Sequence, residues 1–322
     1  MIAKGVVLKN TGSRYSVLID GTDTTVTCAV KGNFRIKGLR TTNPVAVGDK
    51  VEIKYNDPVS EENAFITKVF PRENYIIRRA SNLSKESHIL ASNLDCALLV
   101  ATLSNPVTST TFIDRFLATS AAYDIPAALV INKIDLLEED PEDIEFLKAF
   151  AGLYRTIGYP VFEVSAQTEQ GIDKLAEFLK GKITLISGNS GVGKSSLINR
   201  LIPGLNLKTA RISDVHNTGM HTTTFSEMFR LPEGGWIIDT PGVKGFGTIE
   251  MDKREVDHYF PDIFEVSHSC RYSDCSHTGE PGCAVREALE NHAISESRYN
   301  SYLSILEEAM QEGNSDKYRK PF

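Results

Sequence analysis

The sequence predicts a multidomain protein with an N-terminal all-β barrel of the OB type, a central α/β domain and a C-terminal, mainly α-helical domain. Short runs of alternating apolar and polar residues occupy the first 70 positions, as half-buried strands do. Apolar strands then alternate with helical patterns, and a helical region containing a Cys/His cluster begins near residue 251. The predicted boundaries are 1–70 for the barrel, 71–90 for a linker, 91–247 for the α/β domain and 248–322 for the C-terminal domain.

The composition is that of an ordinary soluble globular protein. The chain has 322 residues, enough for two or three domains, with 24% charged and 41% hydrophobic residues. Its apolar runs all fall short of the roughly 18 residues that span a bilayer, and its first five residues do not resemble a signal peptide. We therefore expect a cytoplasmic protein without a membrane partner, and we expect it to act as a monomer.

The first 70 residues contain five short runs with the alternation of strands, separated by turn signals such as Asp20-Gly21 and Gly48-Asp49. The predicted strands are Val6–Leu8, Tyr15–Ile19, Val26–Val30, Lys50–Ile53 and Ala64–Val69. Five short strands with a long loop after the third favour a small OB-type barrel, a fold that often binds oligonucleotides.

The loop between the third and fourth strands is basic. Residues 1–54 hold nine Lys or Arg against four Asp or Glu, although the whole chain has a net charge of −7. Clustered positive charge around Phe34 favours contact with an RNA backbone, and the alternative is a solvated loop. The RNA-binding candidates are Lys31, Arg35, Lys37 and Arg40. The same two interpretations apply to three arginines of the linker, Arg72, Arg78 and Arg79.

From residue 91 to Asp239, strands and helices alternate, which predicts a mainly parallel sheet in an α/β layer fold. The predicted strands lie in Asn93–Leu103, Ala127–Ile131, Val161–Val164, Ile183–Ile186, Phe225–Leu231 and Trp236–Ile238. The predicted helices are Phe112–Tyr123, Ile172–Lys180 and Ser196–Leu201. Within the first helix, Asp114-Arg115 is interpreted as a surface pair or a helix-packing pair.

A phosphate-binding loop lies between a predicted strand and a predicted helix. Residues Gly188–Ser195 read G-N-S-G-V-G-K-S, which fits the P-loop pattern G-x-x-x-x-G-K-[ST]. Backbone N–H groups of such a loop, together with the helix N-terminus, attract phosphate oxygens. Lys194 would reach the β- and γ-phosphates and the Ser195 hydroxyl would bind Mg²⁺; the alternative, a chance Gly-rich turn, leaves the matching flanks unexplained. The nucleotide-binding candidates are Gly188, Asn189, Ser190, Gly191, Val192, Gly193, Lys194, Ser195 and Ser196.

A second motif predicts that the base is guanine. Asn132-Lys133-Ile134-Asp135 follows the apolar strand at 127–131. The Asp135 carboxylate offers two acceptors to the two donors on one edge of guanine, whereas adenine would leave this charge unpaired. The alternative, a solvated turn, is disfavoured by the accompanying P-loop. Ser165 and Ala166, in the segment Ser165-Ala166-Gln167, are candidates for a second loop that contacts guanine.

A third motif, Asp239-Thr240-Pro241-Gly242, follows the strand at 236–238. Asp239 can hold Mg²⁺ through water, and the Gly242 N–H can contact the γ-phosphate. The polar segment 205–224 has the composition of a switch loop. Thr223 is the preferred Mg²⁺ ligand in it and Thr222 the second choice; alternatively, these threonines only open the following strand.

The order of the motifs is reversed relative to an ordinary GTPase. There the P-loop comes first and the guanine motif last, whereas here Asn132–Asp135 precedes Gly188. The predicted helix 172–180 leads directly into the P-loop strand. A circular permutation explains this order most simply, and termini that lie close together make it tolerable.

The residue after Gly242 is Val243, where many GTPases carry a Gln that orients the attacking water. Valine cannot do this, so either the enzyme is slow alone or another residue positions the water. His221, in the predicted switch loop, is the catalytic candidate; the alternative is a structural or merely exposed histidine.

A metal site is predicted in the C-terminal domain. Three of the five cysteines lie between 270 and 283, which argues for a metal rather than disulfides. The pattern C-x₄-C-x-H-x₅-C offers three thiolates and one imidazole, the ligands of a closed structural zinc site. The alternative of buried unmetallated cysteines is disfavoured because the segment is polar. The predicted ligands are Cys270, Cys275, His277 and Cys283, with His268 as a weaker substitute. Helices are predicted at Ala284–Asn291 and Ser295–Gln311.

Together these features resemble one family, the bacterial GTPases that depend on the small ribosomal subunit (RsgA, also called YjeQ or YloQ). The resemblance covers nearly the whole chain: the basic barrel, N-K-I-D before G-N-S-G-V-G-K-S, G-x-H-T-T-T, D-T-P-G followed by an apolar residue, and C-x₄-C-x-H-x₅-C. It implies an OB domain, a permuted GTPase domain and a zinc domain. It implies one structural zinc ion, Mg²⁺, and GTP hydrolysis stimulated by the small subunit, with 16S rRNA as partner. The implied role is late maturation of that subunit, including release of an assembly factor, and the family's proposed catalytic histidine falls on His221.

Two other functions remain open from the sequence. One is a stand-alone metabolic or RNA-modifying GTPase, which would turn over without ribosomal subunits. The other is an RNA-binding scaffold with a vestigial nucleotide site, against which the intact Lys194, Ser195 and Asp239 count. GTP turnover with and without small subunits distinguishes all three.

Overall fold

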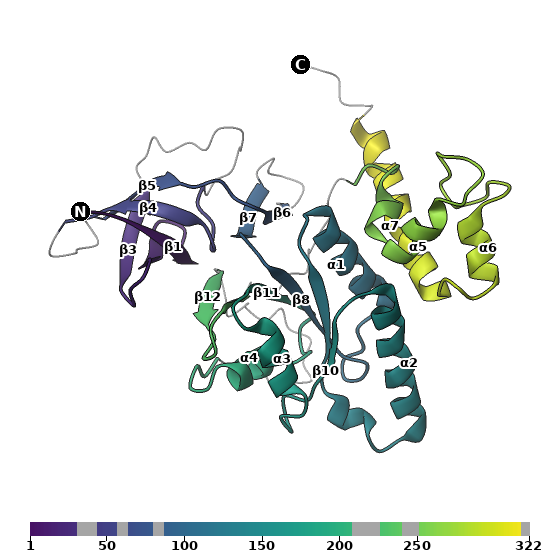
Figure 1. Ribbon diagram of the computed structural model, residues 1–322, viewed down its shortest axis with the longest axis horizontal. Coiled ribbons are helices and arrows are strands. Elements are labelled where there is room, and N and C mark those ends of the chain that lie inside the picture. Colours follow the sequence, from purple (N-terminus) through teal and green to yellow (C-terminus); the bar gives the residue numbers. More distant parts are fainter. Residues whose placement is uncertain (31–43, 57–63, 80–86, 208–225, 240–250, 317–322) are drawn as a thin grey trace.

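The computed structural model describes residues 1–30, 44–56, 64–79, 87–207, 226–239 and 251–316. They form a β-rich N-terminal part, a central α/β part and a helical C-terminal part that lies on the opposite side of the centre from the N-terminus (Figure 1). Within these ranges, none of the helices combines the length and the apolar character that crossing a membrane requires.

The N-terminal part is a five-stranded barrel, as predicted. Its strands are β1 (Ile2–Asn10), β2 (Tyr15–Ile19), β3 (Thr25–Val30), β4 (Lys50–Lys54) and β5 (Phe65–Val69). They pair in the order β1-β2-β3-β5-β4, and β4 pairs back to β1, which closes the barrel. Its core is made of buried side chains such as Val7, Val17, Val26, Ile53 and Ile66. The four basic RNA-binding candidates of the 31–40 loop lie outside the described residues.

The segment expected to be a linker contains structure of its own. β6 (Tyr75–Arg79) and β7 (Ser87–Ser92) form a two-stranded antiparallel sheet. The sequence left open whether Arg72 contacts RNA or is merely exposed. In the structure it is bound to the fully buried Asp49 of the barrel through Nε–Oδ1 at 2.6 Å and Nη2–Oδ2 at 2.7 Å. Asp49 also accepts from the Ser92 hydroxyl at 2.6 Å. The segment is therefore packed onto the barrel by a buried ion pair.

The central part is a six-stranded sheet in the order β10-β9-β8-β11-β13-β12. Strands β8 (Cys96–Ala101), β9 (Ala127–Ile131), β10 (Val161–Glu163), β11 (Ile183–Ser187) and β13 (Trp236–Asp239) are parallel, and β12 (Glu227–Arg230) is antiparallel. Every residue of β8 is buried, as expected of a parallel strand covered on both faces.

Four helices cover the two faces of this sheet. They are α1 (Thr110–Ala122), α2 (Pro141–Ile157), α3 (Ile172–Leu179) and α4 (Lys194–Leu201). The first two pack on one face, where Phe116 and Tyr154 share a core with Leu99. The other two pack on the opposite face, where Leu175 and Leu197 share a core with Leu98. The fold is therefore a doubly wound α/β layer structure.

The barrel continues the central sheet through one strand pairing. Lys9 of β1 lies opposite Glu227 of β12, and their side chains form an ion pair at 2.9 Å. A second, more exposed pair joins Arg230 of β12 to Asp23 of the barrel at 2.8 Å. Such surface pairs contribute little energy. Apolar contact supplies a further link, because Val6 and Leu8 of β1 pack against the core that contains Met228 of β12.

The C-terminal part is helical and packs on α1. Its elements are the 3₁₀-helix η2 (Val256–Tyr259), α5 (Pro261–Ser267), α6 (Ala284–Glu290) and α7 (Glu296–Asp316). Figure 1 shows α1 beside α7, and Ala118 of α1 joins the C-terminal core. Arg298 of α7 binds Asp114 of α1 at 2.7 Å, with both side chains almost fully buried. Asp114 is thus a helix-packing residue, one of the two interpretations its sequence allowed.

Candidate functional site

The predicted nucleotide motifs all follow strands of the central sheet. The P-loop follows β11, Asn132 follows β9, Ser165 lies shortly after β10, and Asp239 ends β13. Because these strands are parallel, their carboxyl ends lie at one edge, where open α/β sheets bind ligands. The structure therefore gathers motifs that are far apart in the sequence.

The P-loop is shaped by glycines that no other residue can replace. Gly188 has φ 149°, and a Cβ there would lie 2.2 Å from the Val100 carbonyl oxygen. Gly193 has φ 89°, and a Cβ there would lie 2.5 Å from the amide nitrogen of Asn132. Helix α4 begins at the next residue, Lys194, so its N-terminus follows directly from the loop. This arrangement presents backbone N–H groups and the positive end of a helix to an anion.

Asn132 joins the N-K-x-D motif to the P-loop, so the two motifs lie side by side. The Asn132 side-chain nitrogen donates to the carbonyl of Val192 in the P-loop at 2.8 Å. Its side-chain oxygen accepts from the backbone N–H of Ala166 at 3.1 Å. The Asn132 side chain is buried, so both bonds are shielded from water. One amide therefore holds three loops together.

Ser165 organises the predicted base-binding end. Its hydroxyl donates to Asp135 Oδ1 at 2.5 Å and accepts from the N–H groups of Gln167 and Thr168 at 3.2 and 3.1 Å. Arg200 of α4 donates to the Ala166 carbonyl at 3.0 Å, which ties this loop to the helix after the P-loop. The motifs named Ser165 and Ala166, but they did not identify Arg200, because no short pattern marks it.

Lys194 and Asp239 lie near each other at the end of the site where the motifs predict phosphate binding. The Lys194 ammonium donates to the carbonyls of Gly188 and Asn189 at 2.6 and 2.8 Å. Burial lowers the pKa of Lys194 from its ordinary value, and the Asp239 carboxylate opposes that shift. Burial likewise raises the pKa of Asp239, opposed by Lys194. Each charge stabilises the other, and a bound phosphate or cation would add a further partner.

Several predicted residues lie outside the described part of the chain. These are the preferred Mg²⁺ ligand Thr223, its alternative Thr222, the catalytic candidate His221, and Gly242. Ser195 and Ser196 lie in the first turn of α4.

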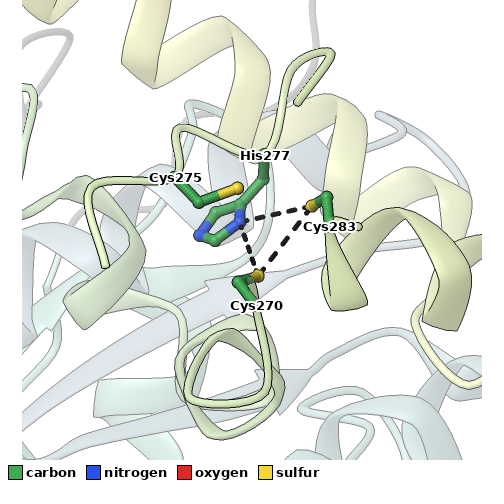
Figure 2. A group of neighbouring side chains, drawn as sticks. All are labelled: Cys270, Cys275, His277 and Cys283. Atoms are coloured by element: carbon green, nitrogen blue, oxygen red, sulfur yellow. Dashed lines mark hydrogen bonds between the residues drawn. The ribbon is translucent and has the colours of Figure 1, made fainter. Parts of the chain in front are cut away.

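The four predicted metal ligands converge in the C-terminal part (Figure 2). The ligand atoms of Cys270, Cys275, His277 and Cys283 all lie within 4.8 Å of one another. His277 Nδ1 is 3.6 Å from the sulfurs of both Cys270 and Cys283, and these two sulfurs are 4.0 Å apart. Tetrahedral zinc, bonded at about 2.3 Å to sulfur and about 2.0 Å to nitrogen, requires sulfurs about 3.8 Å apart and sulfur–nitrogen distances of about 3.5 Å. Cys270, His277 and Cys283 therefore have the spacing of zinc ligands, and Cys275 completes a set of four within 4.8 Å.

Residues outside the motif hold the ligands in place. His277 Nε2 lies 3.5 Å from an Asp257 carboxylate oxygen, so that its Nδ1 faces the thiols. Tyr299 of α7 donates to the His277 carbonyl at 2.6 Å, and Tyr302 donates to the Ser276 carbonyl at 2.9 Å. The weaker candidate His268 is not in the group; its ring packs on Phe264, 4.7 Å between centroids. The motif did not reveal Asp257, which lies on η2, twenty positions before His277.

Comparisons with known proteins agree with this geometry. The family model for the RsgA N-terminal domain matches residues 4–64, and that for the RsgA GTPase matches residues 69–249. A protein of Bacteroides fragilis named small ribosomal subunit biogenesis GTPase RsgA is 58% identical and covers 99% of this chain and 100% of its own. A protein of Porphyromonas gingivalis with the same name is 56% identical and covers 99% of both chains.

Two solved structures are similar over the full length. YjeQ from Thermotoga maritima has a TM-score of 0.78 and 32% identity, covering 96% of this chain and 99% of its own. YloQ, described as a circularly permuted GTPase, has a TM-score of 0.74 and 29% identity, covering 100% and 97%. Both the motif order and the single site built by Asn132 are explained by such a permutation. On these grounds, the chain belongs to the RsgA family of circularly permuted GTPases.

Proposed function

We propose that this protein hydrolyses GTP when the small ribosomal subunit stimulates it, and that it acts in late maturation of that subunit. The observation that supports the hydrolytic part best is the Asn132 amide, which joins a guanine motif and a phosphate loop into one site. The ribosomal part is supported by relatives that are named small ribosomal subunit biogenesis GTPases and match this chain over its full length.

In this proposal the base and the phosphates are held by different ends of the site. Asp135, oriented by Ser165, accepts from the two donors of guanine, and the Ala166 loop closes the base pocket. The P-loop backbone from Gly188 to Gly193 cradles the phosphates, with Lys194 as the neutralising cation. Asn189, Ser190 and Ser196 belong to the same cradle.

Mg²⁺ fits the oxygen donors of the phosphate end. The residues that would hold it are Ser195 directly, Asp239 through water, and Thr223 from the switch segment. When bound, Mg²⁺ supplies charge neutralisation for the phosphates. Because Val243 cannot orient a water molecule, we assign that role to His221.

The two flanking parts have different proposed roles: the barrel contacts RNA, and the C-terminal part is stabilised by a metal ion. We propose that Cys270, Cys275, His277 and Cys283 hold one structural zinc ion, which their mutual distances support. We propose that the basic loop with Lys31, Arg35, Lys37 and Arg40 contacts 16S rRNA. Thiol ligands persist in a reducing compartment, so we propose a cytoplasmic location.

GTP turnover, measured with and without purified small ribosomal subunits, tests this function. The expected result is slow turnover alone and a rise of at least about tenfold with subunits, since activators of GTPases commonly supply more than that. In the same assay, His221→Ala should lose most of the stimulated rate. Fast turnover that ignores subunits would instead indicate a stand-alone GTPase, and binding of GTP without any hydrolysis would indicate a scaffold.

A further inference from the structure

The loop that follows β8 lies against the proposed nucleotide site, although none of the recognised motifs includes it. We call residues 102–108 the β8 loop. The Lys133 ammonium donates to the Asn105 carbonyl of this loop at 2.5 Å. The Pro106 ring lies 3.5 Å from the position a Cβ would take on Gly191 of the P-loop. The β8 loop therefore touches the guanine motif and the phosphate loop at once.

Lys133 is the residue between these two parts. Its Cε atom lies 3.9 Å from the position a Cβ would take on Gly193. Its backbone is left-handed, with φ 64°. Because its stem crosses the P-loop and its ammonium ends on Asn105, the place of the Asn105 carbonyl determines how Lys133 lies across the site.

Two buried hydroxyl groups hold the β8 loop in its shape. The Thr102 hydroxyl donates to the Pro106 carbonyl at 2.5 Å, and the Thr108 hydroxyl accepts from the Thr102 N–H at 3.0 Å. The Thr108 N–H closes the loop by donating to the Thr102 carbonyl at 2.8 Å. Both threonines are almost fully buried, at 0% and 3% exposure. A side-chain substitution at Asn105 cannot remove its backbone carbonyl. The two threonine hydroxyls, one of which holds the neighbouring Pro106 carbonyl, are therefore the groups through which the position of this loop can be tested.

We propose that Thr102 and Thr108 are positioning residues for guanine nucleotide binding, acting through the β8 loop on Lys133 and on the P-loop at Gly191. This inference rests on the proposed guanine nucleotide site. The β8 loop contacts Lys133 of the guanine motif and Gly191 of the P-loop, so we expect it to contribute equally to the binding of GDP and GTP. Losing either hydroxyl should weaken the binding of GDP and of GTP by the same factor. The rate of GTP hydrolysis in the bound complex should not change.

The test compares Thr102→Val and Thr108→Val with Thr119→Val. Thr119, on α1, is equally buried, but its hydroxyl has no hydrogen-bond partner among the described residues. Thr119→Val therefore makes the same change in a buried side chain without removing a hydrogen bond. Titration of the full-length protein with fluorescent GDP and GTP should give about a tenfold rise in Kd for the first two variants. Thr119→Val should stay within about twofold, and Thr102→Ser and Thr108→Ser should restore wild-type binding, since they keep the hydroxyl.

Two further measurements separate positioning from mere stability. In steady-state hydrolysis, the two valine variants should raise KM about tenfold with kcat unchanged. Combining Thr102→Val with Lys133→Met should weaken GDP binding by less than the product of the two single effects, because the loop acts through Lys133. If the effects of Thr102→Val and Lys133→Met on GDP binding were fully additive, the proposal would be overturned. It would also be overturned if the two valine variants melted at lower temperature but kept the wild-type Kd. Failure of the wild-type protein to bind GDP at all would instead refute the proposed function itself.

Discussion

At the scale of single residues, Asn132 links loops that are remote in sequence. Its amide bonds to Val192, sixty positions later, and to Ala166, thirty-four positions later. The N-K-x-D pattern predicted that Asn132 belongs to the site. It did not predict these partners, because a local pattern contains no information about which distant backbone group a side chain will meet. The same holds for Arg72 with Asp49 and for Asp257 with His277.

Replacing Asn132 by Ala should weaken nucleotide binding without unfolding the protein. Both of its bonds would be lost, and the Val192 carbonyl and the Ala166 N–H would be left unpaired in a buried position. Such a loss costs about 1–3 kcal/mol. If the bound state depends on these bonds, the Kd for GDP should rise by about 5- to 140-fold. Isothermal titration calorimetry measures this change.

Asn74→Ala is the matched control for Asn132→Ala. The Asn74 side chain makes the same pair of amide bonds, donating to the Leu94 carbonyl and accepting from the Leu94 N–H, both at 2.8 Å, but away from the nucleotide motifs. It should leave the Kd for GDP within about twofold. If Asn132→Ala also stayed in that range, the amide would not support the site.

At the scale of elements, periodicity and turn signals predicted most of the strands. The five barrel strands and the strands before each nucleotide motif lie where alternation or apolar runs placed them. Several elements were not assigned a range, among them α2 and the two strands β6 and β7. Helix α2 has a clear start, since Asp140 caps it and Pro141 opens it, yet its acidic first turns obscured the apolar stripe that ends at Tyr154. The β6–β7 sheet was interpreted as a linker because its strands are short and separated by a polar stretch.

In the loop with the four predicted metal ligands, too, the sequence pattern identified the local residues but not their distant partners. Spacing alone named the four ligands, because one short segment wraps around one point. Their support comes from η2 and α7, through Asp257, Tyr299 and Tyr302. Burial raises the pKa of Cys275 to about 12, so this thiol must release a proton before it can bind a metal. Affinity for zinc should therefore increase as the pH rises.

Asp257→Asn should weaken zinc binding, because the amide removes the carboxylate that orients the His277 ring. Losses of about 10- to 100-fold in metal affinity are typical of such changes. Competition against a chromophoric chelator measures the affinity. Asp252→Asn is the control, since Asp252 pairs with the exposed Arg254 instead. Equal zinc affinity in both variants and the wild type would contradict this role.

At the scale of the whole molecule, the two flanking parts attach to different places on the GTPase domain. The barrel joins the sheet at β12, and the C-terminal part joins α1 through Arg298. Burial raises the pKa of Asp114, and Arg298 is the main group that opposes this shift. Arg298 also binds Asp262 of α5 at 2.7 Å, so one guanidinium connects two helices of the C-terminal part to α1.

Replacing Arg298 by Met should strongly destabilise the protein, because Asp114 would be left buried and unpaired. Removing one partner of a buried ion pair costs about 3–5 kcal/mol in the free energy of unfolding, which urea denaturation measures. Arg115→Met is the control, because its pair with Glu308 is more exposed and should contribute less than about 1 kcal/mol. Adding Asp114→Asn to Arg298→Met should recover part of the stability. Equal losses for Arg298→Met and Arg115→Met would show that burial of the charge does not matter.

The central claim is that a guanine-recognising carboxylate and a phosphate loop, encoded in reversed order, form a single nucleotide site. The affinities of GDP and XDP for the wild type and for Asp135→Asn test it most directly. The Asn amide replaces one acceptor by a donor, which opposes the amino group of guanine but matches the carbonyl of xanthine. We predict that Asp135→Asn loses GDP affinity by at least about 100-fold and binds XDP more tightly than the wild type does. GDP and XDP affinities that do not change with this substitution would contradict the claim.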